Sequence, residues 1–366
     1  MEYKSVFSQM EHNIVAAYLI TAGVLSLLSN IIVLIMFVKF KEFRTPTNAI
    51  IVNLAFTDIG VSAIGYPMSA ASDLHGSWKF GYSGCQAYAA LNIFFGMASI
   101  GLLTVIAIDR YLIISKPELG RKMTGATYTA LITVAWVNGL LWALMPLMGW
   151  ASYGPDPTGA TCTINWRSND SLFVSYTMTV IGVNFVVPLL IMFFCYYNVS
   201  KTVTRFACHN GLETITLDWS DQLDVTKMSA VMIVVFLVAW SPYAIVCLWS
   251  SFGNPKLIPP SMAIVAPLFA KSSTFYNPCI YVIANKRFRK AIIAMICRQT
   301  QQDLTISHTL PMTISQIPLP LCLKNGKAQK NGREQQGEYG ELLELYYIPN
   351  YLALPHPVTP PSFDLE

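Results

Sequence analysis

A single lysine interrupts a long apolar stretch in the last third of the sequence. Lys271 lies near the middle of the run Ser261–Ala284, and an unpaired lysine at the centre of a membrane span costs at least ~2.5–3.5 kcal/mol. One explanation is a structural lysine that pairs with a neighbouring acid. The other is chemical use, because an amine desolvated by apolar surroundings can condense with an aldehyde to form a Schiff base.

Few other ionisable groups lie within the apolar runs. Asp58 is the only other one deep in a run, and Asp109 and Arg110 lie at the edge of another. A transporter coupled to ions or protons usually has a series of acids or an inverted repeat, and the sequence shows neither. The pattern favours a receptor with one special lysine, and we expect no metal site and no conventional catalytic residues.

The composition excludes several classes of protein. Hydrophobic residues make up 54% of the 366 residues and charged residues 12%, whereas soluble domains have about 25% charged residues. The net charge is only +4, and no basic stripe is interleaved with aromatic residues, so we expect no nucleic-acid partner. A soluble enzyme and a disordered protein are equally disfavoured.

Seven apolar runs are each long enough to cross ~30 Å of hydrocarbon as a helix. Because a backbone in lipid must satisfy its own hydrogen bonds, they predict an all-α membrane protein, a seven-transmembrane helix bundle. The predicted spans are Ile14–Val38, Ala49–Ala71, Gly84–Ile114, Ala126–Met148, Leu172–Tyr197, Met228–Ser250 and Ser261–Ala284.

Lysine and arginine gather in the segments that follow the first, third, fifth and seventh runs. Positive charge stays in the cytoplasm, so the amino terminus is expected outside and the carboxyl terminus inside. We therefore expect an extracellular segment 1–13, a bundle over 14–284, an amphipathic cytoplasmic helix over 285–298 that lies on membrane lipids, and a disordered cytoplasmic tail over 299–366.

Four residues are candidates for covalent modification. Cys85 begins the third run and Cys162 lies in the long loop before the fifth, both on the oxidising side, so we expect a disulfide; the alternative is two free thiols. Cys297 ends the amphipathic segment and is a candidate for palmitoylation, the alternative being an unmodified thiol. Asn169 begins an acceptor sequon for glycosylation on the outer loop.

A set of short motifs, in order along the chain, resembles the opsins, the retinal-binding members of the rhodopsin-like receptors. Lys271 stands six residues before the pair Asn277-Pro278, as the retinal lysine does in opsins. Residues 269–278 and 156–162 most resemble the peropsin group. The other motifs are Asn30, residues 53–58, Asp109-Arg110-Tyr111, Trp136, Pro188, Trp240-Ser241-Pro242-Tyr243 and residues 277–281.

The resemblance implies that retinal, all-trans or 11-cis, binds covalently to Lys271 and needs a counterion. The acid of vertebrate visual pigments is replaced by Tyr88, a phenol that we expect to hydrogen-bond near the attachment. The matching acid is Asp156, six residues before Cys162; the alternative is a solvated acid in an Asp-Pro turn. The pocket is expected to be lined by Asn92, Ile93, Gly96, Met97, Asn184, Phe185, Trp240 and Tyr243; for each except Trp240, helix packing is the alternative.

The resemblance also implies a switch that leads to a heterotrimeric G protein. Asp58 and Asn277, with Asn30, resemble the central polar cluster of the family. Arg110 is expected to pair with Asp109, while Gln222 replaces the usual second acid at the base of the sixth span. Tyr196 and Tyr281 complete the candidate switch residues.

Four functions are compatible with these features to different degrees. The peropsin resemblance implies a photoisomerase or retinoid sensor that converts all-trans-retinal to the 11-cis form, in the retinal pigment epithelium or other photoreceptive cells, with retinoid-handling proteins as partners. A conventional light-sensing receptor that signals through a G protein is the main alternative. A receptor for a diffusible ligand is weaker, because Lys271 argues against it and Tyr88 and Asn92 of the third span offer no acid for an amine. A transporter is weakest, because the sequence shows neither a series of acids nor an inverted repeat.

Overall fold

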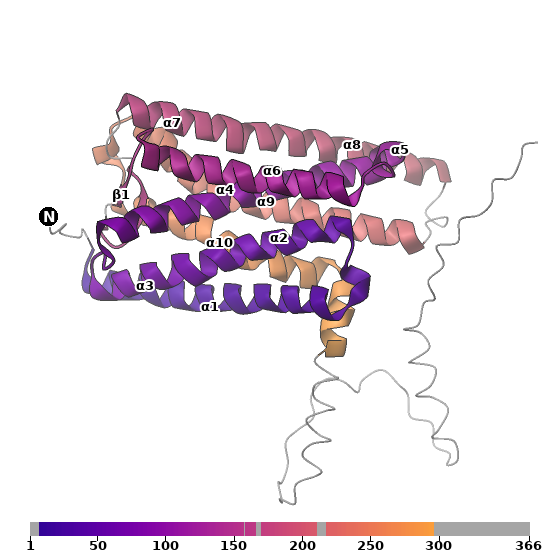
Figure 1. Ribbon diagram of the computed structural model, residues 1–366, viewed down its shortest axis with the longest axis horizontal. Coiled ribbons are helices and arrows are strands. Elements are labelled where there is room, and N and C mark those ends of the chain that lie inside the picture. Colours follow the sequence, from indigo (N-terminus) through magenta and orange to yellow (C-terminus); the bar gives the residue numbers. More distant parts are fainter. Residues whose placement is uncertain (1–6, 157, 166–169, 211–216, 296–366) are drawn as a thin grey trace, which may run out of the picture. The chain divides into compact units, whose positions relative to one another are not determined.

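The computed structural model describes residues 7–156, 158–165, 170–210 and 217–295, all within one compact unit. Long helices lie side by side in this unit (Figure 1). The segments that contain the seven predicted runs are α1 (Gln9–Lys39), α2–η2–α3 (Pro46–Gly60, Val61–Gly65, Tyr66–His75), α4 (Gly81–Ser115), α6–η3 (Gly125–Leu144, Met145–Met148), α7–η4–α8 (Ser171–Ile181, Gly182–Val186, Val187–Asn210), α9 (Leu217–Phe252) and α10 (Pro260–Ala284). The predicted seven-helix bundle is confirmed.

Short elements join these segments. They are η1 (Lys41–Phe43), α5 (Pro117–Gly120), η6 (Pro255–Leu257), and the strands β1 (Tyr153–Pro155) and β2 (Cys162–Ile164). We call the end of the bundle that carries the two strands the outer end. A further helix over residues 286–295 follows α10, within the segment predicted to be amphipathic; its Phe288 ring contacts Phe43 and Tyr281 with centroids 5.9 and 5.8 Å apart.

Six helical segments of the described chain are long and apolar enough to cross a membrane. The seventh, α10, has 25 residues but carries Lys271, the hydroxyl residues 272–274 and Asn277, which lower its hydropathy. Residues 272–274 and Asn277 are nevertheless buried. The least apolar span is therefore the one whose polar side chains face the interior of the bundle.

The first helix begins earlier than the hydropathy pattern predicts. The side chain of Ser8 accepts a hydrogen bond from the amide of Glu11, while the carboxylate of Glu11 accepts one from the amide of Ser8 at 2.8 Å. This reciprocal cap starts α1 at Gln9 rather than at Ile14. As a result His12, expected in the extracellular segment, is a helical residue and only 1% exposed.

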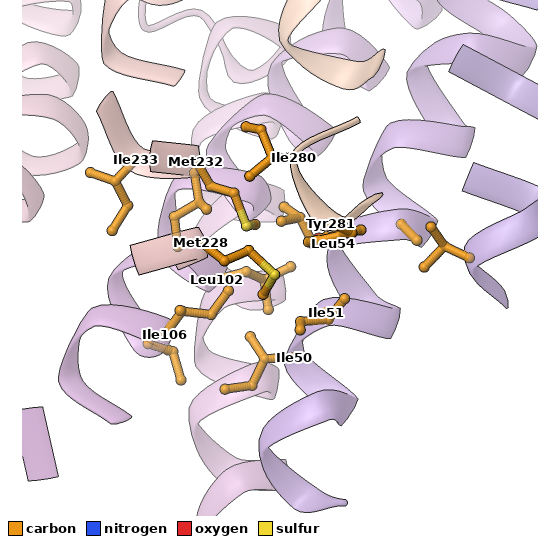
Figure 2. Packing of buried hydrophobic residues seen from close by; sticks show 14 of the residues in the cluster. Ile50, Ile51, Leu54, Leu102, Ile106, Met228, Met232, Ile233, Ile280 and Tyr281 are labelled. Atoms are coloured by element: carbon orange, nitrogen blue, oxygen red, sulfur yellow. The ribbon is translucent and has the colours of Figure 1, made fainter. Parts of the chain in front are cut away.

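The inner half of the bundle is held by a continuous apolar core. Figure 2 shows Ile50 and Leu54 of α2, Leu102 and Ile106 of α4, and Met228 and Met232 of α9 around Tyr281 of α10. Helices in lipid gain little from apolar burial against one another, so close packing of shapes must hold them together. Small residues at the contacts make that packing tight.

Gly139 of α6 provides a test of this packing. A Cβ atom at Gly139 would lie 2.6 Å from the carbonyl oxygen of Phe94 and 3.0 Å from the amide nitrogen of Ala98, both backbone atoms of α4. We expect Gly139→Ala to lower the free energy of unfolding by about 1–3 kcal/mol, measured as thermal unfolding of the protein in lipid nanodiscs. Gly125→Ala is the control, since a Cβ there meets nothing within 4 Å; equal stability of the two variants would contradict the explanation.

Candidate ligand-binding site

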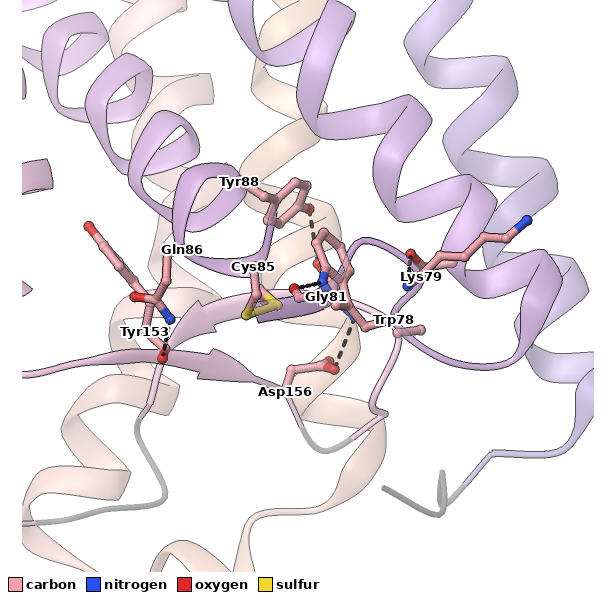
Figure 3. The surroundings of a disulfide bond; sticks show 12 residues. Trp78, Lys79, Gly81, Cys85, Gln86, Tyr88, Tyr153 and Asp156 are labelled. Atoms are coloured by element: carbon pink, nitrogen blue, oxygen red, sulfur yellow. Dashed lines mark hydrogen bonds between the residues drawn. A yellow bond between two sulfur atoms is a disulfide. The ribbon is translucent and has the colours of Figure 1, made fainter. Parts of the chain in front are cut away.

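A short β-hairpin lies against the outer end of α4. Strands β1 and β2 pair antiparallel, with Tyr153 opposite Ile164, and the predicted disulfide between Cys85 and Cys162 is confirmed. Figure 3 shows this bond joining the hairpin to α4, with Asp156 on the hairpin loop and Tyr88 on the helix. The hairpin therefore holds Asp156 and residues 158–161 over the interior of the bundle.

The amine of Lys271 reaches two hydroxyl groups below this hairpin. It donates to Ser69 Oγ of α3 at 2.8 Å and to the Tyr88 hydroxyl of α4. Thr161 of the hairpin loop donates to the same Tyr88 oxygen at 2.9 Å. Helices α3, α4 and α10 and the hairpin thus meet at one nitrogen atom, and its described side-chain partners there are neutral.

Asp156 is buried and is not the solvated turn residue of the alternative interpretation. The residue is only 2% exposed, and one of its carboxylate oxygens accepts a hydrogen bond from Thr158 Oγ1 at 2.7 Å. The other, Oδ2, has no partner among the described residues. Asp156 makes no ion pair within 4.0 Å of Lys271 in the described chain, so hydroxyl groups separate the two.

Two adjoining cavities extend from Lys271 into the bundle, with empty volumes of about 700 and 670 Å³. The first contains Lys271 and Tyr88, and the second runs between α4, α7–η4 and α9. The residues predicted to line the pocket border one or both: Asn92, Ile93, Gly96, Met97, Asn184, Phe185, Trp240 and Tyr243.

Trp240 lies where the two cavities meet. A Cβ atom at Gly96 would lie 2.6 Å from its ring, so glycine lets the indole pack directly on α4. Below it the ring stacks on Phe236 with centroids 5.5 Å apart. Farther out, the Tyr243 hydroxyl and Thr163 Oγ1 are 2.6 Å apart, which ties α9 to the hairpin.

Several residues of this site were not identified from the sequence. Ser69 and Thr161 contact the Lys271–Tyr88 pair, and Thr163 holds Tyr243. Hydroxyl residues are common in membrane helices and loops, and only the fold shows which of them meet. Asp73 and His12 are also buried near the outer end, although the hydropathy pattern placed both outside the spans.

The inner polar residues form a second group. Asn277 donates to the Asp58 carboxylate at 3.0 Å, as the predicted cluster requires. Asn30 instead donates to the carbonyl oxygens of Ser26 and Thr274, both at 2.9 Å. The cluster is therefore joined through α10 rather than by direct contact between Asn30 and Asp58.

At the opposite end from the hairpin, Arg110 forms an ion pair with Asp109 and donates to Gln222 Oε1 of α9 at 2.9 Å. Gln222 thus contacts Arg110 as a neutral acceptor. Tyr281 is buried in the hydrophobic core, and Tyr196 packs against that core; their part in a switch stays a prediction. Cys297 and Asn169 lie outside the described residues.

The motifs, the seven helices and the hairpin together agree with comparisons to known proteins. Residues 29–281 match the model of the seven-transmembrane receptors of the rhodopsin family. The chain belongs to this family. Human visual pigment-like receptor peropsin is 70% identical over 86% of this chain and 94% of its own length, so the chain is an opsin similar to peropsin.

More distant opsins agree. The rhodopsin of Enteroctopus dofleini is 31% identical over 76% of this chain and 64% of its own. The crystal structure of squid rhodopsin superimposes with a TM-score of 0.73 at 30% identity, over 78% of this chain and 85% of that one. Fold and family therefore rest on sequence and structure alike, while the roles of individual site residues stay predictions.

The burial of Asp156 predicts a pH dependence of stability in the retinal-free protein. Burial raises the pKa of Asp156 from 3.8 to about 6, so between these values the folded protein binds more protons than the unfolded chain. The free energy of unfolding should therefore fall as pH rises from about 4 to 6, by ~3 kcal/mol, and stay level above.

Asp156→Asn should remove this decrease, as measured by unfolding in nanodiscs across that range. Asp170→Asn is the matched control, because Asp170 is an exposed helix cap and asparagine also caps helices. Parallel pH curves for wild type and Asp156→Asn would show that the carboxyl group does not titrate in this window.

Proposed function

We propose that this opsin binds retinal covalently through Lys271 and converts light into a change of retinal isomer, all-trans to 11-cis, with G protein signalling as a second output. One observation carries the proposal: the Lys271 amine opens into a long, mostly apolar cavity in the middle of the bundle. Bound retinal would supply light absorption and isomerisation about a double bond. The protein's residues supply attachment, charge balance and shape.

Each part of the site has a role in this proposal. Lys271 provides the nucleophilic amine, and the hydroxyls of Ser69 and Tyr88 orient it. Asp156 is the proposed counterion, and its Oδ2 atom has no partner among the described residues. It acts through Thr161, whose amide donates to the Asp156 carboxylate and whose hydroxyl donates to Tyr88. The disulfide-bonded hairpin keeps water away from the attachment, which strengthens charge interactions inside.

The apolar cavities suit an elongated polyene. Trp240 at their junction would contact the middle of such a ligand and transmit its change of shape, because Pro242 lies inside α9 and frees a carbonyl where the helix can bend. The direction from all-trans to 11-cis rests on the similarity to peropsin. The alternative, a photoreceptor that binds 11-cis-retinal and signals, uses the same pocket and the Arg110 switch.

Reconstitution with retinal tests the attachment. We expect the purified protein to acquire an absorption band when all-trans- or 11-cis-retinal is added in the dark, and Lys271→Ala to lose it completely. Lys79→Ala, a variant of an exposed outer lysine, should keep it. A wild-type protein without a Lys271-dependent band would leave a seven-helix receptor for some other ligand.

Retinal extraction before and after illumination then distinguishes the two outputs. We expect light to raise the 11-cis fraction in protein loaded with the all-trans form. An unchanged isomer ratio together with light-dependent nucleotide exchange on a G protein would favour the conventional photoreceptor instead.

Asp156→Asn tests the counterion. Removing the only acid on the hairpin loop should let the attachment lose its proton near neutral pH, so that the band moves from the visible into the near-ultraviolet. The measurement is the absorption spectrum at pH 7, with Asp170→Asn as control. An unshifted visible band would exclude Asp156 as the counterion.

Gln222→Glu tests the restraint on Arg110. A hydrogen bond to a neutral amide contributes about 0.5–1.5 kcal/mol and one to a charged group about 1.5–3, so the carboxylate should hold the resting state more firmly. We expect basal and light-driven nucleotide exchange on the G protein to fall severalfold, while Gln222→Ala should raise basal exchange. The same rates in both variants would show that this contact does not restrain the receptor.

A further inference from the structure

A third cavity lies on the outer side of Lys271 and brings charged residues from three elements together. It has an empty volume of about 350 Å³ and is bordered by Lys271 of α10, Asp156 and Thr161 of the hairpin loop, and Ser69 and Asp73 of α3. Polar side chains thus continue beyond the amine, in contrast to the apolar cavities on its other side. Two carboxyl groups, Asp156 and Asp73, face the space next to one lysine.

Asp73 is held by a histidine from another helix. His12 Nδ1 of α1 and Asp73 Oδ1 are 2.8 Å apart, and the two residues are 1% and 5% exposed. Asp73 lies four residues after Ser69, so both side chains project from the same face of α3. Because Ser69 contacts the amine directly, Asp73 stands one helical turn farther out on the same side.

The other titratable groups packed around this cavity are few. Tyr88 of α4 and Tyr66 of α3 are buried phenols, and the Tyr66 hydroxyl donates to the carbonyl oxygen of Lys271 at 2.8 Å. Glu11 and His75, the nearest ionisable neighbours of His12 and Asp73 along their helices, are exposed. The charge next to Lys271 in the described chain is therefore set by Asp156 and by the His12–Asp73 pair.

We propose that Asp73 is a second acid of the Lys271 site and that His12 sets how much of its charge the site experiences. The contact between His12 Nδ1 and Asp73 Oδ1 holds the carboxyl group toward α1, so His12 and Lys271 compete for the same acid. Asp73 stabilises a positive charge on Lys271 more strongly when the His12 contact is lost. This inference rests on the proposed function for its effect on bound retinal, but not for its effect on the free amine.

Retinal-loaded protein gives the first test, in the Asp156→Asn background where Asp73 is the remaining acid. There the visible band should reappear as the pH is lowered, and the midpoint of this titration is the measurement. Adding Asp73→Asn should lower the midpoint by about one pH unit, whereas Asp73→Glu should leave it near its original value.

His12→Gln in the same background should shift the midpoint the opposite way, because Asp73 then loses the histidine contact that competes with Lys271. A purely structural role for the pair predicts no such opposite shifts. The proposal would be overturned if adding Asp73→Asn or His12→Gln left the midpoint at its value for Asp156→Asn alone.

The retinal-free protein gives a second test that does not depend on retinal binding. Formaldehyde with cyanoborohydride methylates only unprotonated amines, and peptide mass spectrometry reports the rate at Lys271. Without Asp73 less of the amine is protonated, so Asp73→Asn should methylate about fivefold faster at pH 7, His12→Gln more slowly than wild type, and Asp170→Asn at the wild-type rate.

Equal rates in wild type and Asp73→Asn would overturn the inference even if retinal binds. The wild-type protein could instead fail to gain a Lys271-dependent absorption band and still show the expected methylation rates. That result would refute the proposed function but support the role of Asp73 as a second acid. The two failures are therefore distinguishable.

Discussion

The charge of one amine in the middle of an apolar bundle constrains the whole outer half of this protein. Lys271 lies midway along α10, and its described side-chain contacts are the hydroxyls of Ser69 and Tyr88. Neutral acceptors do not balance a positive charge, and a buried charge left without compensation is destabilising by about 3–5 kcal/mol. A nearby acid is needed, and burying an acid requires a structure that covers it. The hairpin, fixed to α4 through Cys85, provides that cover for Asp156.

The backbone of α10 connects this outer site to the inner half of the bundle. The carbonyl oxygen of Lys271 accepts hydrogen bonds from Tyr66 at 2.8 Å and from Thr274 at 3.0 Å. One turn farther in, Asn277 donates to Asp58. A change at the Lys271 side chain therefore acts on a helix whose polar groups already bond to α1, α2 and α3. Such a contiguous network can transmit a movement only if it has two stable arrangements, and Pro267 and Pro278 inside α10 weaken the backbone ladder where rearrangement would occur.

Sequence patterns were sufficient for the bundle but not for the full site. Each hydropathy run corresponds to one helical segment because lipid leaves the backbone no alternative, and Lys271 and the Cys85–Cys162 pair follow from topology and residue type. The same hydropathy criterion ended the second span at Ala71 and began the first at Ile14, so Asp73 and His12 were left outside. A hydropathy criterion cannot distinguish polar residues that pair with each other between two helices from polar residues of a loop. Their pairing depends on how α1 packs against α3, which no local pattern contains.

The two ends of the bundle handle their cations in a similar manner. By resemblance to other opsins, Tyr88 stands where visual pigments have an acid beside the lysine, and Gln222 stands where the family has an acid facing Arg110. In both places a neutral hydrogen-bonding side chain contacts the cation. At the outer end the proposed counterion, Asp156, lies one step removed behind Thr161. At the other end the acid that pairs with Arg110 is Asp109, its neighbour on the same helix. Direct contact between opposite charges across helices is therefore absent at these two sites of the described chain. Without ion pairs between neighbouring helices at these two sites, the bundle offers less resistance to a change in the shape of its ligand. This property would suit both the proposed isomerisation and the proposed signalling.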